Sequence, residues 1–110
     1  MKGWTSWKAM PSPQNCRMIE GPPGSGIYQI KNKVTGQLIQ FGIGVECQYR
    51  MKSLFPAPHG TGKRNNSNKR QYILDNWKDL EFRTYATDTR PEAKQIEDKL
   101  KAQNNHLFNT

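Results

Sequence analysis

The sequence predicts a small α/β domain, an α+β sandwich in which a three-stranded, mainly antiparallel sheet is flanked by three helices in the order ββ-α-α-β-α. Three observations predict this fold. Two apolar-rich runs enclose a turn-forming connection, a third run alternates apolar and polar residues, and three stretches have helical spacing. Because 110 residues suit one domain with a modest core, we treat 1–110 as a single unit.

The first two strands are predicted over Ile27–Lys31 and Leu38–Phe41. Alternate residues of the first run point to opposite sides, as in a strand. The connection Asn32–Gly36 consists of turn-formers and charged residues, so the pair is predicted to form a β-hairpin. The Gly-Ile-Gly that begins at Gly42 is expected to end the second strand.

A first helix is predicted over Val45–Leu54. Cys47 and Met51 share one narrow arc of the helical wheel, and Arg50 falls in the same arc. An inward arginine is either a boundary residue whose charged end reaches solvent or a residue that holds an anion in a cleft. The helical pattern leaves both interpretations open.

The segment 56–68 is predicted to be a long loop rich in proline, glycine, asparagine and basic residues. From Cys47 to Leu74 there is no carboxylate. A surface of one sign of charge favours a polyanion. We therefore expect nucleic-acid contacts from this part of the chain, with the candidates Lys52, His59, Lys63, Arg64, Asn65, Asn66, Lys69 and Arg70.

Three further elements complete the predicted order. A second helix, capped by Asn66 or Ser67, extends through about Trp77. Alternating residues over Leu80–Ala86 predict the third strand. The sequence Thr-Arg-Pro-Glu at 89–92 is a capping box that opens the last helix.

Glu97 lies inside the apolar arc of that last helix, together with Ala93, Ile96 and Leu100. An inward carboxylate is costly unless it is paired, hydrogen-bonded or bound to a metal. Glu97 is therefore either a structural carboxylate or a functional one.

Residues 1–25 contain four prolines and form an irregular N-terminal arm in this prediction. Trp4, Trp7, Met10 and Met18 are too apolar for a free tail, so we expect the arm to lie across the core. An arm that binds a partner is the alternative.

The net charge of +8 is unevenly distributed. Residues 1–74 hold eleven basic and two acidic residues, whereas residues 75–110 hold six basic and seven acidic ones. This asymmetry favours a nucleic-acid partner, and a solvated basic face without a partner is the alternative. An anionic membrane is disfavoured because the basic residues do not lie opposite an apolar helical stripe.

Composition also argues against several classes of protein. No apolar run is long enough for a membrane span or a signal peptide. Cys16 and Cys47 are too few and too far apart for a disulfide framework or a metal site, so we expect free thiols in a reducing cytoplasm. Two histidines, His59 and His106, both in expected loops, argue against Ser-His-Asp and Cys-His nucleophile sets.

An inward carboxylate, an inward arginine and a strand tyrosine remain, beside a basic loop. These groups suit phosphodiester hydrolysis. A carboxylate such as Glu97 holds a hard divalent ion that keeps most of its waters. The ion and Arg50 stabilise charge in the transition state. The phenol or phenolate of Tyr28 orients or deprotonates the attacking water.

The same residues resemble the GIY-YIG nuclease superfamily. The triplet Gly26-Ile27-Tyr28, the spacing of eight from Gly42 to Arg50 and the spacing of twelve from Glu97 to Asn109 occur in the family's order. The resemblance covers about residues 26–109. It implies the family's three-stranded antiparallel sheet with flanking helices.

The resemblance also implies roles for individual residues. Tyr28 becomes the tyrosine near the attacking water, and Arg50 the phosphate-binding arginine. Glu97 becomes the single carboxylate on one Mg²⁺ or Mn²⁺ ion, and Asn109 supports the site. The implied chemistry is metal-dependent cleavage that leaves 5′-phosphate and 3′-hydroxyl ends.

The sequence departs from the family at one site position. Gln40-Phe41-Gly42 stands where the family has Tyr-Ile-Gly, so Gln40 replaces the second tyrosine. Gln40 hydrogen-bonds a water but does not act as a base, so Tyr28 or a metal-bound hydroxide must do so. The family's histidine or tyrosine before the second helix falls on Asn65 or Asn66, and His59 or Lys63 can substitute.

The expected function is therefore a cytoplasmic endonuclease of low sequence specificity, with DNA preferred and RNA possible as substrate. A homodimer or an inhibitor protein is conceivable. One alternative is a nucleic-acid-binding module of the same fold that has lost cleavage, suggested by Gln40. Another is an interaction domain that uses Trp4 and Trp7.

Overall fold

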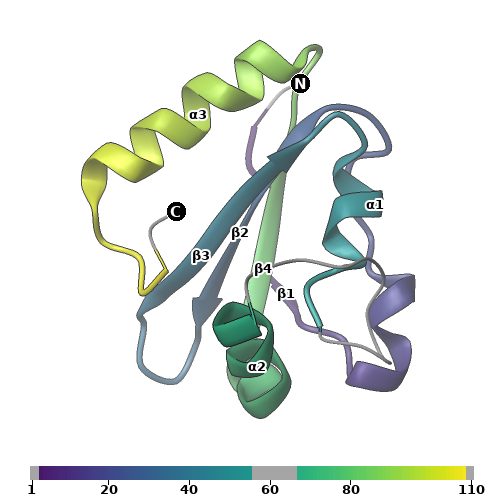
Figure 1. The fold of residues 1–110 in the computed structure, drawn as a ribbon, viewed down its shortest axis with the longest axis vertical. Helices are drawn as coiled ribbons and strands as arrows, with labels where there is room; N and C mark the ends of the chain where they lie inside the picture. The colour runs from purple at the N-terminus through teal and green to yellow at the C-terminus, as the bar shows by residue number, and fades with distance from the viewer. Residues whose placement is uncertain (1–2, 56–66, 109–110) are drawn as a thin grey trace.

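The computed structural model describes residues 3–55 and 67–108. Its four strands form one antiparallel sheet in the order β1-β4-β2-β3 (Figure 1). The site candidates His59, Lys63, Arg64, Asn65, Asn66 and Asn109 lie outside the described residues. The elements in chain order are β1 (Lys8–Ala9), the 3₁₀ turn η1 (Pro13–Met18), β2 (Gly26–Asn32), β3 (Leu38–Gly44), α1 (Cys47–Met51), α2 (Ser67–Asn76), the 3₁₀ turn η2 (Trp77–Asp79), β4 (Leu80–Ala86) and α3 (Arg90–Gln103).

The predicted hairpin is present as β2 and β3. Its turn is stabilised by Asn32, whose Oδ1 accepts hydrogen bonds from the backbone N–H groups of Val34 and Thr35 at 2.9 and 3.1 Å. Gly36 then adopts the positive φ of 77° that glycine tolerates. Strand β3 runs on to Gly44, so the Gly-Ile-Gly segment belongs to the strand that it was predicted to end.

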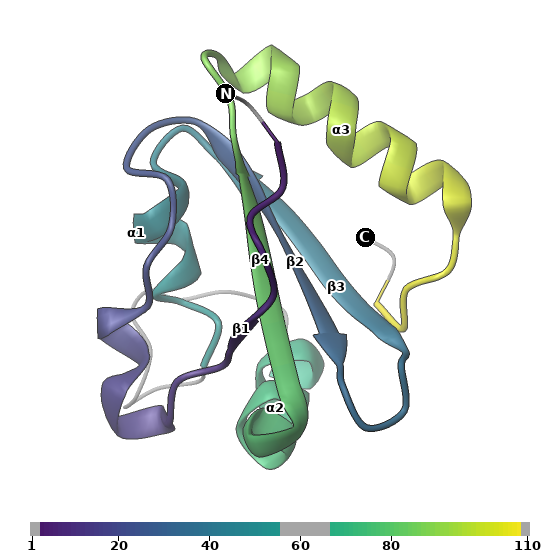
Figure 2. The same ribbon diagram turned by 180° about the vertical axis from the view of Figure 1, so that it is seen from behind.

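The sheet has a fourth strand that the sequence did not predict. The N-terminal arm runs beside β4 (Figure 2), where Trp4 bridges Tyr85 and β1 pairs with residues 81–82. The Met10 N–H donates to the carbonyl of Leu80 at 3.0 Å. The arm therefore packs on the domain, as expected, but as an edge strand. A two-residue strand beside prolines has no visible period, which explains the difference.

The two faces of the sheet carry separate apolar clusters. One face, here called the α1 face, buries Tyr28 and Ile30 of β2 against Cys47 and Met51 of α1. The other, the α3 face, buries Ile27, Phe41 and Ile43 against Ala93 and Leu100 of α3. Figures 1 and 2 show α1 and α3 on opposite sides of the sheet. Neighbouring residues of β2 therefore face different helices.

The helices match the prediction in order but not always in length. Helix α3 begins after Thr89, whose Oγ1 accepts from the Glu92 N–H at 3.4 Å, as the capping box predicts. Its last residue, Gln103, is followed by the capping residue Asn104, whose backbone is in the left-handed conformation. Helix α1 has five residues, not the ten predicted, because Ser53 Oγ donates to the Arg50 carbonyl at 2.7 Å and the chain turns. In the described ranges, no helix is both long and apolar enough to cross a membrane.

Candidate functional site

The side chain of Tyr28 extends from β2 over the neighbouring strand β3. It pairs with Gly42 of β3, and its ring covers that glycine. A Cβ atom at residue 42 would stand 2.6 Å from the Tyr28 hydroxyl oxygen and 2.7 Å from Cε1 and Cζ of the ring. These distances are shorter than side-chain atoms tolerate, so only glycine fits beneath the buried Tyr28.

Arg50 contacts the next glycine along the same strand. Its Cδ and Cβ atoms lie 3.2 and 3.4 Å from the position of a Cβ on Gly44. Its Nε atom is buried and has no hydrogen-bond partner in the part of the chain that the structure describes. A buried donor without a partner carries a desolvation cost, and an anion bound to this half-buried guanidinium would offset it after a shift of the side chain. This position agrees with the anion-holding interpretation of the inward arginine.

Gln40 precedes these two positions on the same face of β3. It pairs with Ile30, which faces α1, so its side chain points to the α1 face. Gln40 is buried, and its Oε1 atom has no partner among residues 3–55 and 67–108. Residues 40, 42 and 44 are two apart, so they stand in line at steps of roughly 7 Å. We call this line the β3 row: Gln40, the Tyr28 hydroxyl over Gly42, and Arg50 over Gly44.

The β3 row combines an acceptor, a phenol and a cation. The Arg50 guanidinium can donate to a phosphate oxygen, and Gln40 Oε1 can accept from a water molecule. Cys47 is also on this face, but burial raises the pKa of its thiol to about 11, against the opposing effect of Arg50. The thiol is therefore protonated at neutral pH, and the residue packs as an apolar group.

Glu97 is held on the other side of the sheet by α3. Its side chain is 14% exposed, and Oε1 accepts from Lys94 Nζ at 2.9 Å. The Lys94 ammonium also pairs with Asp98 at 3.0 Å, and its hydrogen bonds to Glu97 and Asp98 raise its pKa. Contacts among the described residues do not join Glu97 to the β3 row. Helix α3 packs on β3, however, and β3 is an edge strand, so both faces adjoin the same edge.

Three of the basic candidates are in the described ranges, and none is fully exposed. Lys52 caps the end of α1 and is partly buried. Lys69 and Arg70 lie in the first turn of α2, within the predicted second helix. Arg70 is 7% exposed, and its Nε and Nη2 atoms have no hydrogen-bond partner in the described part of the chain.

No pattern in the sequence predicts the polar network on the α3 face. Gln29, 1% exposed, joins His106 and Arg83, which are 77 and 54 residues away. His106 is buried against Phe41, with ring centroids 4.7 Å apart, and burial lowers its pKa. The sequence pattern predicts a loop at His106 but not its burial. Its backbone bridge to Leu38 holds it against the edge of β3.

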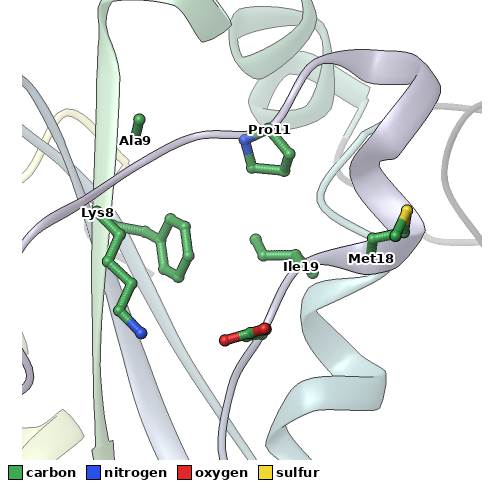
Figure 3. A pocket seen from close by; sticks show the side chains of 7 residues that line it. Lys8, Ala9, Pro11, Met18 and Ile19 are labelled. Atoms are coloured by element: carbon green, nitrogen blue, oxygen red, sulfur yellow. The ribbon is translucent and has the colours of Figure 1, made fainter.

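A separate shallow hollow lies between β1 and η1 (Figure 3). Its charged members are Lys8 and Glu20, and no residue of the β3 row lines it. The remaining lining residues are Ala9, Pro11, Met18, Ile19 and Phe82. This hollow is therefore distinct from the β3 row.

The sequence matches no protein-family model, no curated protein and no solved structure. In the described ranges, no three His, Cys, Asp or Glu side chains gather into a metal-binding group.

Proposed function

We propose that this protein is a metal-dependent endonuclease of the GIY-YIG type, which hydrolyses DNA phosphodiester bonds with low sequence specificity. The observation that carries the proposal is the contact of Tyr28 with Gly42. A phenol fixed over Gly42, with Arg50 over the next glycine, Gly44, supports a site for water attack on a bound phosphate. This contact also gives a physical reason for Gly42, the glycine of the second motif triplet.

Each residue of the β3 row has a role in the proposed reaction. Arg50 binds a phosphate oxygen through its half-buried guanidinium and stabilises the negative charge that develops there. Tyr28 orients the attacking water, and its phenolate form accepts the proton. Gln40 accepts a hydrogen bond from the same water through its buried Oε1. The products are 5′-phosphate and 3′-hydroxyl ends.

Glu97 is the residue that would hold the metal ion. A carboxylate oxygen suits Mg²⁺ or Mn²⁺, and a single carboxylate suffices because Mg²⁺ keeps several waters. The side chain is partly accessible, and its hydrogen-bonding partner Lys94 is the more exposed of the two, so an ion can compete for the carboxylate. When bound, the ion supplies Lewis-acid stabilisation of the phosphate charge.

Plasmid nicking tests this proposal. Wild-type protein is incubated with supercoiled DNA in the presence of Mg²⁺ or of EDTA, beside Glu97→Ala. We expect nicking by the wild type with Mg²⁺ only, and none by the variant. Nicking that persists in EDTA or in Glu97→Ala would refute the metal role of this carboxylate.

The second candidate is a nucleic-acid-binding module that does not cleave. Two observations favour it. Gln40 replaces a tyrosine and is no base, and Glu97 is carried by the face of the sheet opposite Tyr28. This candidate predicts DNA binding that weakens steeply with salt, without nicking in any metal.

A further inference from the structure

Arg83 of β4 lies between two indole rings of the N-terminal arm. Its guanidinium carbon is 4.3 Å from the ring centroid of Trp4 and 4.6 Å from that of Trp7. Cation–π contacts of this kind hold a guanidinium in a fixed orientation. The indoles therefore restrict the arginine to one position on the α3 face.

Gln29 fixes the same guanidinium from the neighbouring strand. Arg83 Nε donates to Gln29 Oε1 at 2.8 Å, and the two residues are direct cross-strand partners. The amide of Gln29 is buried and is held in turn by His106, with 3.0 Å between Gln29 Nε2 and His106 Nε2. A buried chain of hydrogen bonds thus sets the direction of the Arg83 fork.

The hydrogen-bonding capacity left to Arg83 is on its two Nη atoms. Its Nε is used by Gln29 and both indoles contact the guanidinium, while in the described ranges no hydrogen bond involves its Nη atoms. The residue is partly exposed, not buried. A planar pair of N–H donors of this kind matches a phosphate group in two parallel hydrogen bonds.

The charged side chains around Arg83 leave this patch positively charged. Lys31 Nζ lies 4.5 Å from the ring centroid of Trp7, so this indole contacts two cations. Glu81 is the nearby carboxylate, at 3.8 Å from Lys31, and both side chains of this pair are partly exposed. A loose, partly exposed pair neutralises Lys31 only weakly. The patch therefore retains the positive charge of Arg83.

We propose that Arg83, fixed by Trp4, Trp7 and Gln29, is a binding site for a backbone phosphate of the nucleic acid. The site rests on the proposed nucleic-acid partner, and the net charge of +8 favours a polyanion. Arg83 is on β4, which β2 separates from β3, and it faces the side of the sheet opposite Tyr28, so the phosphate at Arg83 is not the one that is cleaved. Arg83 therefore anchors the nucleic acid at a point outside the reaction site.

Binding of a short fluorescein-labelled DNA duplex, measured in EDTA by anisotropy across a salt series, tests this site. Arg83→Gln is compared with Arg90→Gln, which removes the same charge from an exposed position at the start of α3. We expect Arg83→Gln to weaken binding roughly tenfold and to lower the salt slope by about one, with a smaller effect for Arg90→Gln. Equal affinities of the two variants would overturn the site.

Arg83→Lys separates phosphate binding from a role in holding the arm. Lysine retains the charge and the stem between the indoles but lacks the planar fork. Because lysine leaves the buried Gln29 Oε1 without its Nε donor, we expect Arg83→Lys to unfold at a lower temperature than the wild type but to stay folded in the binding assay, and to bind several-fold more weakly. Wild-type affinity in this variant would also overturn the site. Arg83-dependent binding without plasmid nicking would refute only the nuclease, whereas nicking without Arg83-dependent binding would refute only this site.

Discussion

The Tyr28 hydroxyl oxygen lies only 2.6 Å from the point where residue 42 would carry a Cβ atom, because Gly42 leaves that space empty. One methyl group on the neighbouring strand therefore decides whether the tyrosine keeps its position.

Replacement of Gly42 by alanine should displace the Tyr28 ring. Forcing a methyl group into a packed site costs about 1–3 kcal/mol, and the phenol leaves its place over β3. We expect a lower free energy of unfolding, measured in urea, and loss of nicking. Gly24→Ala is the matched control, because nothing lies within 4 Å of a Cβ there. Nicking at the wild-type rate by Gly42→Ala would show that the position of Tyr28 is irrelevant.

Replacement of Tyr28 by phenylalanine removes the hydroxyl group and keeps the ring. The ring packing on Cys47 and Met51 is retained, so the free energy of unfolding should fall by only about 1 kcal/mol. We expect the nicking rate to fall at least a hundredfold, because general base catalysis contributes on that order. A rate within a factor of two of the wild type would assign the base role elsewhere.

Replacement of Glu97 by glutamine should separate chemistry from folding. The ion pair with Lys94 is surface-exposed on the lysine side, so its loss should alter stability little. Nicking should be abolished, since an amide is a poor ligand for a hard divalent ion. Urea unfolding and nicking are measured on the same preparation. A large loss of stability with nicking retained would identify Glu97 as a structural carboxylate.

His106 should make folding stability depend on pH. Burial lowers its pKa in the folded state below the ordinary value of 6.5, so the unfolded chain binds the proton more readily. Its contribution to stability is then complete above pH 6.5 and is lost as pH falls from there through the folded-state pKa. Urea unfolding between pH 8 and pH 5 measures this loss, with His106→Gln as the comparison. An identical pH slope in the variant would remove His106 as its source.

Local patterns in the sequence predict the hairpin, β4 and α3 because each extends over five or more residues with a clear period. The Leu80–Ala86 strand was predicted with its observed bounds. The edge strand Lys8–Ala9 is too short to show a period, and α1 is shorter than predicted because Ser53 bonds the Arg50 carbonyl.

The site was only partly predictable for a similar reason. Tyr28, Arg50 and Gln40 are named by motif spacing, and the structure aligns them along β3. The links of Gln29 to Arg83 and His106 span 54 and 77 residues, and no local pattern encodes contacts over such separations. Only the folded chain reveals them.

The nicking rate of Arg50→Met at saturating DNA and Mg²⁺, compared with that of Lys52→Met, shows whether cleavage needs the guanidinium of the β3 row. Methionine keeps an aliphatic stem over Gly44 and removes the guanidinium. Lys52 is a cation two residues along the chain, at the end of α1 and outside the β3 row. If Arg50 stabilises the cleaved phosphate, Arg50→Met loses nicking while Lys52→Met retains it. Equal rates for the two variants, or nicking by neither the wild type nor the variants, would contradict it.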